Sequence, residues 1–331
     1  MMRLAAMIAV AAAVAAANPA SASAAAPDAH RLAAALLASS ELSAAPAPAE
    51  PKPLSHAIGT DLFVSTDADH TDVIKAGLNL DWRYSGPEQY LGIRLEKAWF
   101  RPIGRRWQDR NRVYLRAANS LGGWKWNVTA GTDGHTALGS ADIHDEAPFR
   151  KEVFLEREIL ETPEGLRRPI YYTFGGAALD LPVDENNVFT LVAGLQDFTG
   201  RNLRTQLRAN FVHVLGANSG LSIQLRTRYF HDSVPHEFDY YSPRWYAQAV
   251  PILQLRRFTN KGWRYLLAGG IGVQRDSDTG WRRSSYFNAQ LASPPRAGWS
   301  GTSSLLFSET PTATGRSYNY LQLTFGLTRR F

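Results

Sequence analysis

The stretch that decides the fold is RSYNYLQLTFGLTRRF, residues Arg316–Phe331. Its centre alternates between apolar and polar residues, with Leu321, Leu323, Phe325 and Leu327 on one side and Gln322, Thr324, Gly326 and Thr328 on the other. A period of two gives a β-strand one apolar and one polar face. At the edge of a soluble sandwich such a strand would be sticky. As the closing strand of a membrane barrel it would turn its apolar face to lipid, and the rest of the chain favours this interpretation.

The same stretch resembles the terminal signature of outer-membrane β-barrels, which ends in an aromatic residue on the apolar face. Here that residue is Phe331. One departure is Arg329, where the signature usually has an aromatic or apolar residue. The resemblance implies that Phe331 is needed for barrel closure.

Strand patterns recur along the chain from His56 onward. We count about 14 segments, each close to the roughly 9–11 residues that a tilted spanning strand needs. Arg150–Ile159 is a further candidate, and a hairpin inside Thr132–Arg168 would raise the number to about 16. The sequence therefore predicts an all-β fold, a transmembrane antiparallel up-and-down β-barrel of about 14 to 16 strands.

The connections alternate in length, as they do in single-chain outer-membrane barrels. Ser85–Pro87 and Asn260–Gly262 are short turns, whereas Arg101–Asn111, Thr132–Arg168 and Asp232–Pro243 are long. Counting back from Phe331 places the short turns on the periplasmic side and the long loops outside. The strand count and the lengths of the connections agree with this assignment of the two sides.

The N-terminal part of the chain differs in composition. Arg3, an apolar run and then small residues in an A-x-A pattern predict a signal peptide over residues 1–24. Residues 25–55 are rich in Ala and Pro and predict a low-complexity periplasmic linker, which leaves 56–331 for the barrel. The chain has no cysteine, which excludes a lipoprotein anchor and disulfide bonds. We expect the protein in the outer membrane of a Gram-negative bacterium.

Cations dominate the polar faces of the predicted strands, and the chain has a net charge of +6. Three consecutive strands carry the candidate lumen and substrate-binding residues Arg204, Arg208, Arg226, Arg228, Arg244 and Arg256, with Tyr246 as a stacking platform for sugars. Further cations on polar faces are Lys75, Arg83, Arg94, Arg112, Arg116, Lys125 and Arg264. Opposite them we find only Asp81 and Glu96 on the strands. This imbalance predicts an anion-selective lumen. Two alternatives are a general porin with a basic wall, and arginines that pair with loop acids folded inward.

One stretch, FDYYSPRWY at Phe238–Tyr246, leads into the strand AQAVPILQLRRF and then GWRYLLAGGIGVQR. Over Arg226–Gln274 the chain resembles the barrel region of the exopolysaccharide-export and phage-adsorption proteins that carry tetratricopeptide repeats. The resemblance implies a sixteen-stranded barrel that exports a polysaccharide. Residues 25–55 have no room for such a repeat and a linker, so a periplasmic scaffold would be a separate protein.

The expected function is therefore an outer-membrane channel that conducts or exports a polar, anionic solute, with an exopolysaccharide as the leading substrate. Expected partners are outer-membrane lipid, the solute or polysaccharide, a periplasmic scaffold protein and the barrel assembly machinery. We expect no cofactor, no bound nucleic acid and no enzymatic activity. A phage receptor is a further alternative.

Two other sites remain as alternatives. His231 and Ser233 resemble the His-x-Ser of outer-membrane phospholipase A, although the Asn-Gly that follows it in that family is absent. They would serve a lipid hydrolase if the serine had a positioned base. The loop residues His135, Asp142, His144 and Asp145 would suit a metal ion, but scattered loop residues are more often solvated.

Overall fold

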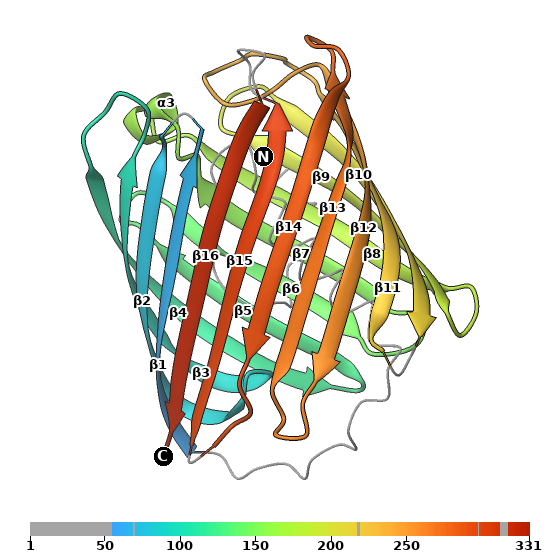
Figure 1. Ribbon diagram of the computed structural model, residues 1–331. Coiled ribbons are helices and arrows are strands. Elements are labelled where there is room, and N and C mark those ends of the chain that lie inside the picture. The colour runs from blue at the N-terminus through green and yellow to red at the C-terminus, as the bar shows by residue number, and fades with distance from the viewer. Residues whose placement is uncertain (1–54, 69, 217–218, 297, 312–316) are drawn as a thin grey trace.

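The computed structural model describes residues 55–68, 70–216, 219–296, 298–311 and 317–331. They form a closed antiparallel barrel of sixteen strands in which each strand pairs with its sequence neighbours and β16 pairs with β1 (Figure 1). The predicted signal peptide and linker lie outside the described residues. No helix in the described part of the chain is long and apolar enough to cross a membrane.

The strands are β1 (Ser55–Asp67), β2 (Asp72–Gly86), β3 (Gln89–Arg101), β4 (Gln108–Leu121), β5 (Trp124–Thr132), β6 (Ala137–Asp145), β7 (Lys151–Ile159), β8 (Tyr171–Pro182), β9 (Asn187–Phe198), β10 (Leu203–Gly216), β11 (Leu221–Asp232), β12 (Trp245–Phe258), β13 (Arg264–Asp276), β14 (Arg282–Ala292), β15 (Trp299–Pro311) and β16 (Ser317–Arg330). A short helix, α3 (Pro163–Arg167), lies between β7 and β8.

The two faces of each strand differ as the alternation predicts. On β10, Leu207 and Phe211 point outward and are 52% and 39% exposed, whereas Arg208 and Asn210 point inward and are buried. A closed ring pairs every strand edge, and its apolar outer face suits lipid. The prediction of an outer-membrane β-barrel is thus confirmed.

The ring closes between the first and last strands. Val64 on β1 lies opposite Leu323 on β16. At the end of the chain, Phe331 and His56 form a reciprocal pair of backbone hydrogen bonds. Phe331 N donates to His56 O at 3.0 Å, and His56 N donates to Phe331 O at 3.2 Å. The amphipathic stretch that opened the sequence analysis therefore forms the seam of the barrel.

The strand count is sixteen, so the larger of the two predicted numbers is confirmed. The additional pair is β6 and β7, inside Thr132–Arg168, the stretch for which the sequence leaves a long loop and a hairpin as alternatives. β7 matches the candidate segment Arg150–Ile159 closely. The sequence pattern does not predict β6, because ALGSADIHD mixes small residues with acids and shows little alternation of apolar and polar residues.

The two ends of the barrel carry different connections. The short turns β2–β3 and β12–β13 lie at the end where β16 finishes, and we call this the inner end. α3 and the β11–β12 loop lie at the opposite, outer end (Figure 1). This arrangement agrees with the predicted parity, because periplasmic turns are short in such barrels and outer loops are long.

One face assignment was wrong. The sequence placed Arg83 on the inner face with Asp81, but Asp81 pairs with Gly92 and Arg83 with Leu91, which makes Trp82 an extra residue on β2. Such a bulge shifts the following side chains by one position. Tyr84 is therefore buried in the interior, and Arg83 is exposed.

Candidate functional site

A network of buried ion pairs covers the inner face of β1 to β4. The carboxylate of Glu96 accepts from Arg94 Nη2 at 2.6 Å and from Arg112 Nη1 at 3.0 Å. Arg94 also pairs with Asp61, and Arg116 pairs with Asp81. Arg94, Glu96, Arg112 and Asp81 are buried, so each needs its partner to offset the loss of hydration.

The network also crosses the lumen. Arg112 Nη2 donates to Glu158 Oε1 at 2.7 Å, which joins β4 to β7. Lys75 Nζ on β2 lies 2.8 Å from Glu161 Oε1, in the loop after β7. Because β2 and β7 are not neighbours in the ring, these contacts reach across the interior. The charged network therefore links the wall of β2 to β4 with β7 and the loop that follows it.

The charges on this wall are largely balanced, which corrects the count made from the sequence. Glu158 lies on a strand that had been counted as loop, and Glu161 belongs to a loop that folds inward. The alternative in which cations pair with inward-folded loop acids thus holds for Lys75. Such pairing across the lumen depends on the closure of the ring, which strand patterns alone do not reveal.

Two loops meet over the outer mouth. Asp239, in the loop between β11 and β12, accepts from Thr162 Oγ1 at 2.6 Å and from Glu164 N at 2.7 Å, at the start of α3. Beneath this contact Leu160 and Tyr240 join one buried apolar cluster. The β7–β8 and β11–β12 loops therefore form a single packed layer, which we call the outer layer.

The outer layer is also fixed to the neighbouring β9–β10 loop. Glu237 Oε2 accepts from Asn202 N at 2.8 Å, and Glu237 Oε1 accepts from Arg201 N at 2.7 Å. The ring of Tyr240 stacks on Phe198 with centroids 4.4 Å apart. Burial raises the pKa of the Tyr240 hydroxyl above its ordinary value, so it stays protonated and serves the neutral packing of this layer.

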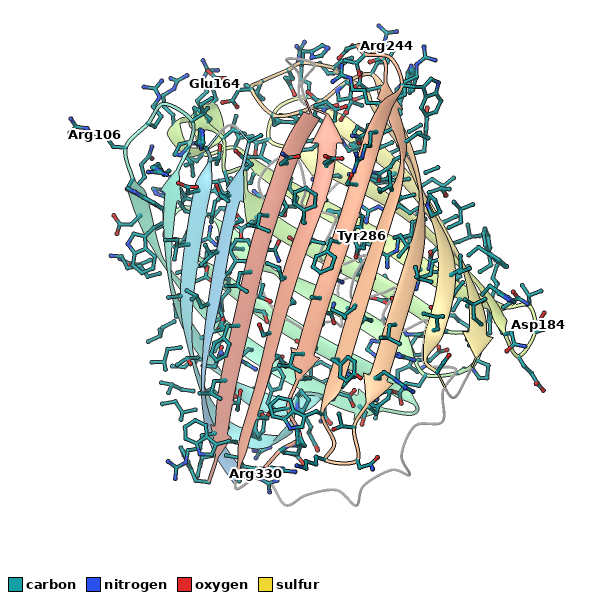
Figure 2. All side chains as sticks on the ribbon, viewed as in Figure 1. Arg106, Glu164, Asp184, Arg244, Tyr286 and Arg330 are labelled. Carbon is teal, nitrogen blue, oxygen red and sulfur yellow. The ribbon has the colours of Figure 1, made fainter. Side chains whose placement is uncertain are left out.

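The Asp239 contact gives a first prediction. Asp239→Ala should loosen the outer layer and raise the rate of trypsin cleavage after Arg167 about tenfold, the effect of losing roughly 1.5 kcal/mol of charged hydrogen bonding. The measurement is limited proteolysis of the folded protein in detergent. Asp184→Ala is the matched control, because Asp184 bonds to Asn186 N in a turn well away from α3 (Figure 2). Equal cleavage of the two variants would contradict the contact.

Across the interior, β10 and β11 carry a different wall, which we call the guanidinium wall: Arg208, Arg226 and Arg228. Arg208 and Arg228 are direct cross-strand partners, and Arg226 lies opposite Asn210. Arg208 Nη2 donates to Gln206 Oε1 at 2.7 Å, and Arg226 Nη2 donates to Gln224 Oε1 at 3.2 Å. The Arg228 guanidinium lies over the ring of Phe230, 5.2 Å from its centre. Each of these three cations thus contacts an amide or an aromatic ring.

The other predicted arginines lie elsewhere. Arg204 is buried and pairs with Asp232, with Nε 3.0 Å from Oδ1. Arg244 is exposed at the outer end just before β12, far from Arg330 at the inner end (Figure 2). Arg256 lies near the inner end of β12, with its guanidinium 5.9 Å from the ring of Phe258. The structure therefore brings together the central three of the six and separates the others.

The tyrosines also differ from one another. Tyr246 is fully buried, stacks on Phe230 with centroids 4.9 Å apart, and donates to Gln274 Oε1 at 2.9 Å. Its ring is part of the packing of the barrel wall. Tyr286 on β14 is half-buried at mid-height (Figure 2), and the Arg226 guanidinium lies 4.6 Å from its ring centre. Of the two, Tyr286 is therefore the ring that borders the lumen.

The hydrolase alternative gains no support from the geometry. His231 lies opposite Trp245 on the outward face. Ser233 Oγ accepts a hydrogen bond from Leu203 N at 2.8 Å, and no described contact joins it to His231. A serine nucleophile needs a base within hydrogen-bond reach.

Three of the four residues considered for a metal lie on β6, which is a strand, and they do not gather around one point. Asp142 and His144 lie on β6, with His144 Nδ1 3.2 Å from Asp142 Oδ2, while Asp145 binds Lys151. Among the residues that the structure describes, no group of three or more His, Asp or Glu side chains is placed to hold a metal ion.

Comparison with known proteins shows the fold. A structure described as a bacterial polysaccharide outer membrane secretin superposes with a TM-score of 0.64 at 12% identity, covering 86% of this chain and 100% of that chain. A structure of Pseudomonas aeruginosa OprD aligns over 86% of this chain and 98% of that chain at 8% identity, with a TM-score of 0.43. No protein-family model and no curated protein matches the sequence.

Proposed function

We propose that this protein is an outer-membrane channel for polar solutes, with a preference for anionic ones, and that a polysaccharide chain is its substrate. The observation that carries the proposal is the guanidinium wall. Three cations on adjacent strands face the interior, where amides and aromatic rings contact them. Positively charged residues that line a pore favour the passage of anions.

The chemistry of this wall also suits sugars. Guanidinium and amide groups donate planar hydrogen bonds to carboxylates and hydroxyls, and aromatic faces accept the apolar side of a sugar ring. The similar barrel described as a polysaccharide outer membrane secretin agrees with this substrate class. The stretch Phe238–Tyr246, on which the family resemblance rests, forms part of the outer layer through Asp239 and Tyr240.

Solute uptake by liposomes tests the proposal. Liposomes that contain the protein should admit gluconate faster than the neutral polyol sorbitol, which is similar in size, because the guanidinium wall attracts the carboxylate. The triple variant Arg208→Gln, Arg226→Gln, Arg228→Gln should lose this preference and still admit sorbitol. Equal rates for the two solutes in the unmodified protein would indicate a general pore, and no uptake of either would refute a channel.

A further inference from the structure

Beside Arg226, several buried polar groups lack a hydrogen-bond partner among the residues that the structure describes. Both amide atoms of Asn210 and the Nε2 of Gln224 are of this kind. Asn210 is 2% exposed and Gln224 is 1% exposed. A buried polar group without a partner costs free energy, so it is rarely retained unless something else binds to it.

The cross-strand neighbours of Asn210 and Gln224 do not supply hydrogen bonds to these amide atoms. Asn210 lies between Thr190 on β9 and Arg226 on β11. Thr190 directs its hydroxyl to Asp180 Oδ1 at 2.6 Å. Gln224 lies between Val212 and Ile252, which offer no polar side chain. These amide atoms therefore keep a hydrogen-bonding capacity that no described residue uses. Because the atoms are buried, a ligand meets them only when neighbouring side chains shift.

Arg226 extends from the same patch toward β14. Its cross-strand partner on β12 is Val250, and the cross-strand partner of Tyr286 on β13 is Gly270. Residues with small side chains therefore lie between Arg226 and Tyr286. The guanidinium passes over them to within 4.6 Å of the Tyr286 ring centre, and the Tyr286 hydroxyl has no described partner. Arg226 makes no ion pair with any residue that the structure describes.

We infer that Asn210, Gln224, Arg226 and Tyr286 form a subsite for one carboxylated sugar residue. The amides supply a donor and an acceptor for neighbouring hydroxyls, and the guanidinium supplies two parallel donors for a carboxylate. A simple anion would leave the amides without partners, and a neutral sugar would leave the positive charge of Arg226 without an anion. Only a hydroxylated acid meets both needs. Because Arg226 and Tyr286 are half-buried, the subsite opens to the lumen on their side.

This inference rests on the proposed function, since the ligand reaches the subsite through the lumen. Calorimetric titration of the purified protein in detergent with tetragalacturonate and with neutral maltotetraose tests it. The acidic oligomer should bind at least about tenfold more tightly, the effect expected of a charge-assisted hydrogen bond. Arg226→Gln should abolish this difference and leave the affinity for maltotetraose unchanged.

A second variant separates binding from folding. Asn210→Leu should weaken binding of tetragalacturonate and leave the stability of the barrel unchanged or higher, because it removes polar atoms that have no partner in the protein. Gln274→Leu is the matched control. Gln274 accepts from Tyr246 Oη and donates to Arg283 O, so its loss should lower stability and leave the affinity unchanged.

The outcomes distinguish the two proposals. Absence of tetragalacturonate binding, or equal affinity of the parent, Arg226→Gln and Asn210→Leu proteins, would overturn the subsite and indicate that water occupies it. Ion conductance of the same preparations in planar bilayers is measured in parallel. Conductance without binding would remove the subsite alone, whereas binding without conductance would remove the channel and keep the subsite.

Discussion

Replacing Glu96 by alanine should lower the free energy of unfolding of the barrel by about 3–5 kcal/mol, the usual cost of removing one partner from a buried ion pair. Glu96 is 5% exposed and receives hydrogen bonds from both Arg94 and Arg112. Its removal leaves the buried guanidinium groups of Arg94 and Arg112 with fewer carboxylate partners to offset their lost hydration. Denaturant titration in detergent micelles, followed by tryptophan fluorescence, measures the change.

The neighbouring residue provides the control. Lys97 pairs with Asp109 at 2.7 Å on the outward face, and the two side chains are 44% and 51% exposed. Lys97→Ala should change the free energy of unfolding by no more than about 1 kcal/mol, because exposed pairs contribute little. Similar losses for Glu96→Ala and Lys97→Ala would mean that the network across the lumen is not a buried one.

Leu323→Arg should lower the stability of the barrel in lipid by about 2–4 kcal/mol, the cost of a cation on the lipid face near the bilayer midplane. Leu323 is 42% exposed and lies on the outward face at the middle of β16, between Val64 and Leu305. Folding into lipid vesicles, measured by the shift in gel mobility of the unboiled protein, reports the effect.

Leu121→Arg makes the same chemical change outside the apolar belt. Leu121 is 78% exposed in the last position of β4, next to an inner turn. The cost there should fall to about 0–1 kcal/mol, since the residue lies near water. If both variants fold into vesicles as well as the parent protein, the outer face does not contact lipid.

Much of the fold follows from local pattern. The alternation on β10, β11 and β16 fixes which side chains face lipid, because a strand has a strict period of two. The same rule failed at Trp82, where one extra residue changes the face of everything after it, and a bulge leaves no clear mark in composition. β6 was missed since its small and acidic residues do not alternate in hydrophobicity.

The candidate site was less accessible to sequence reasoning. The alternation predicts that Arg208, Arg226 and Arg228 face the interior. It does not predict which side chains contact them. The contact between Lys75 and Glu161 joins residues on distant strands, and only the closed ring brings them together. The missing partners of Asn210 and Gln224 likewise depend on side-chain positions, which no pattern of residue types specifies.

Reversal potential under a KCl gradient in planar bilayers tests the central claim most directly, that the guanidinium wall gives the lumen its preference for anions. The parent protein should be anion-selective, and the variant with Arg208, Arg226 and Arg228 replaced by glutamine should shift toward cations. A variant with the exposed cations Arg105, Arg106 and Lys261 replaced by glutamine loses the same charge outside the lumen and should behave like the parent. A cation-selective parent protein, or equal shifts in both variants, would contradict the account.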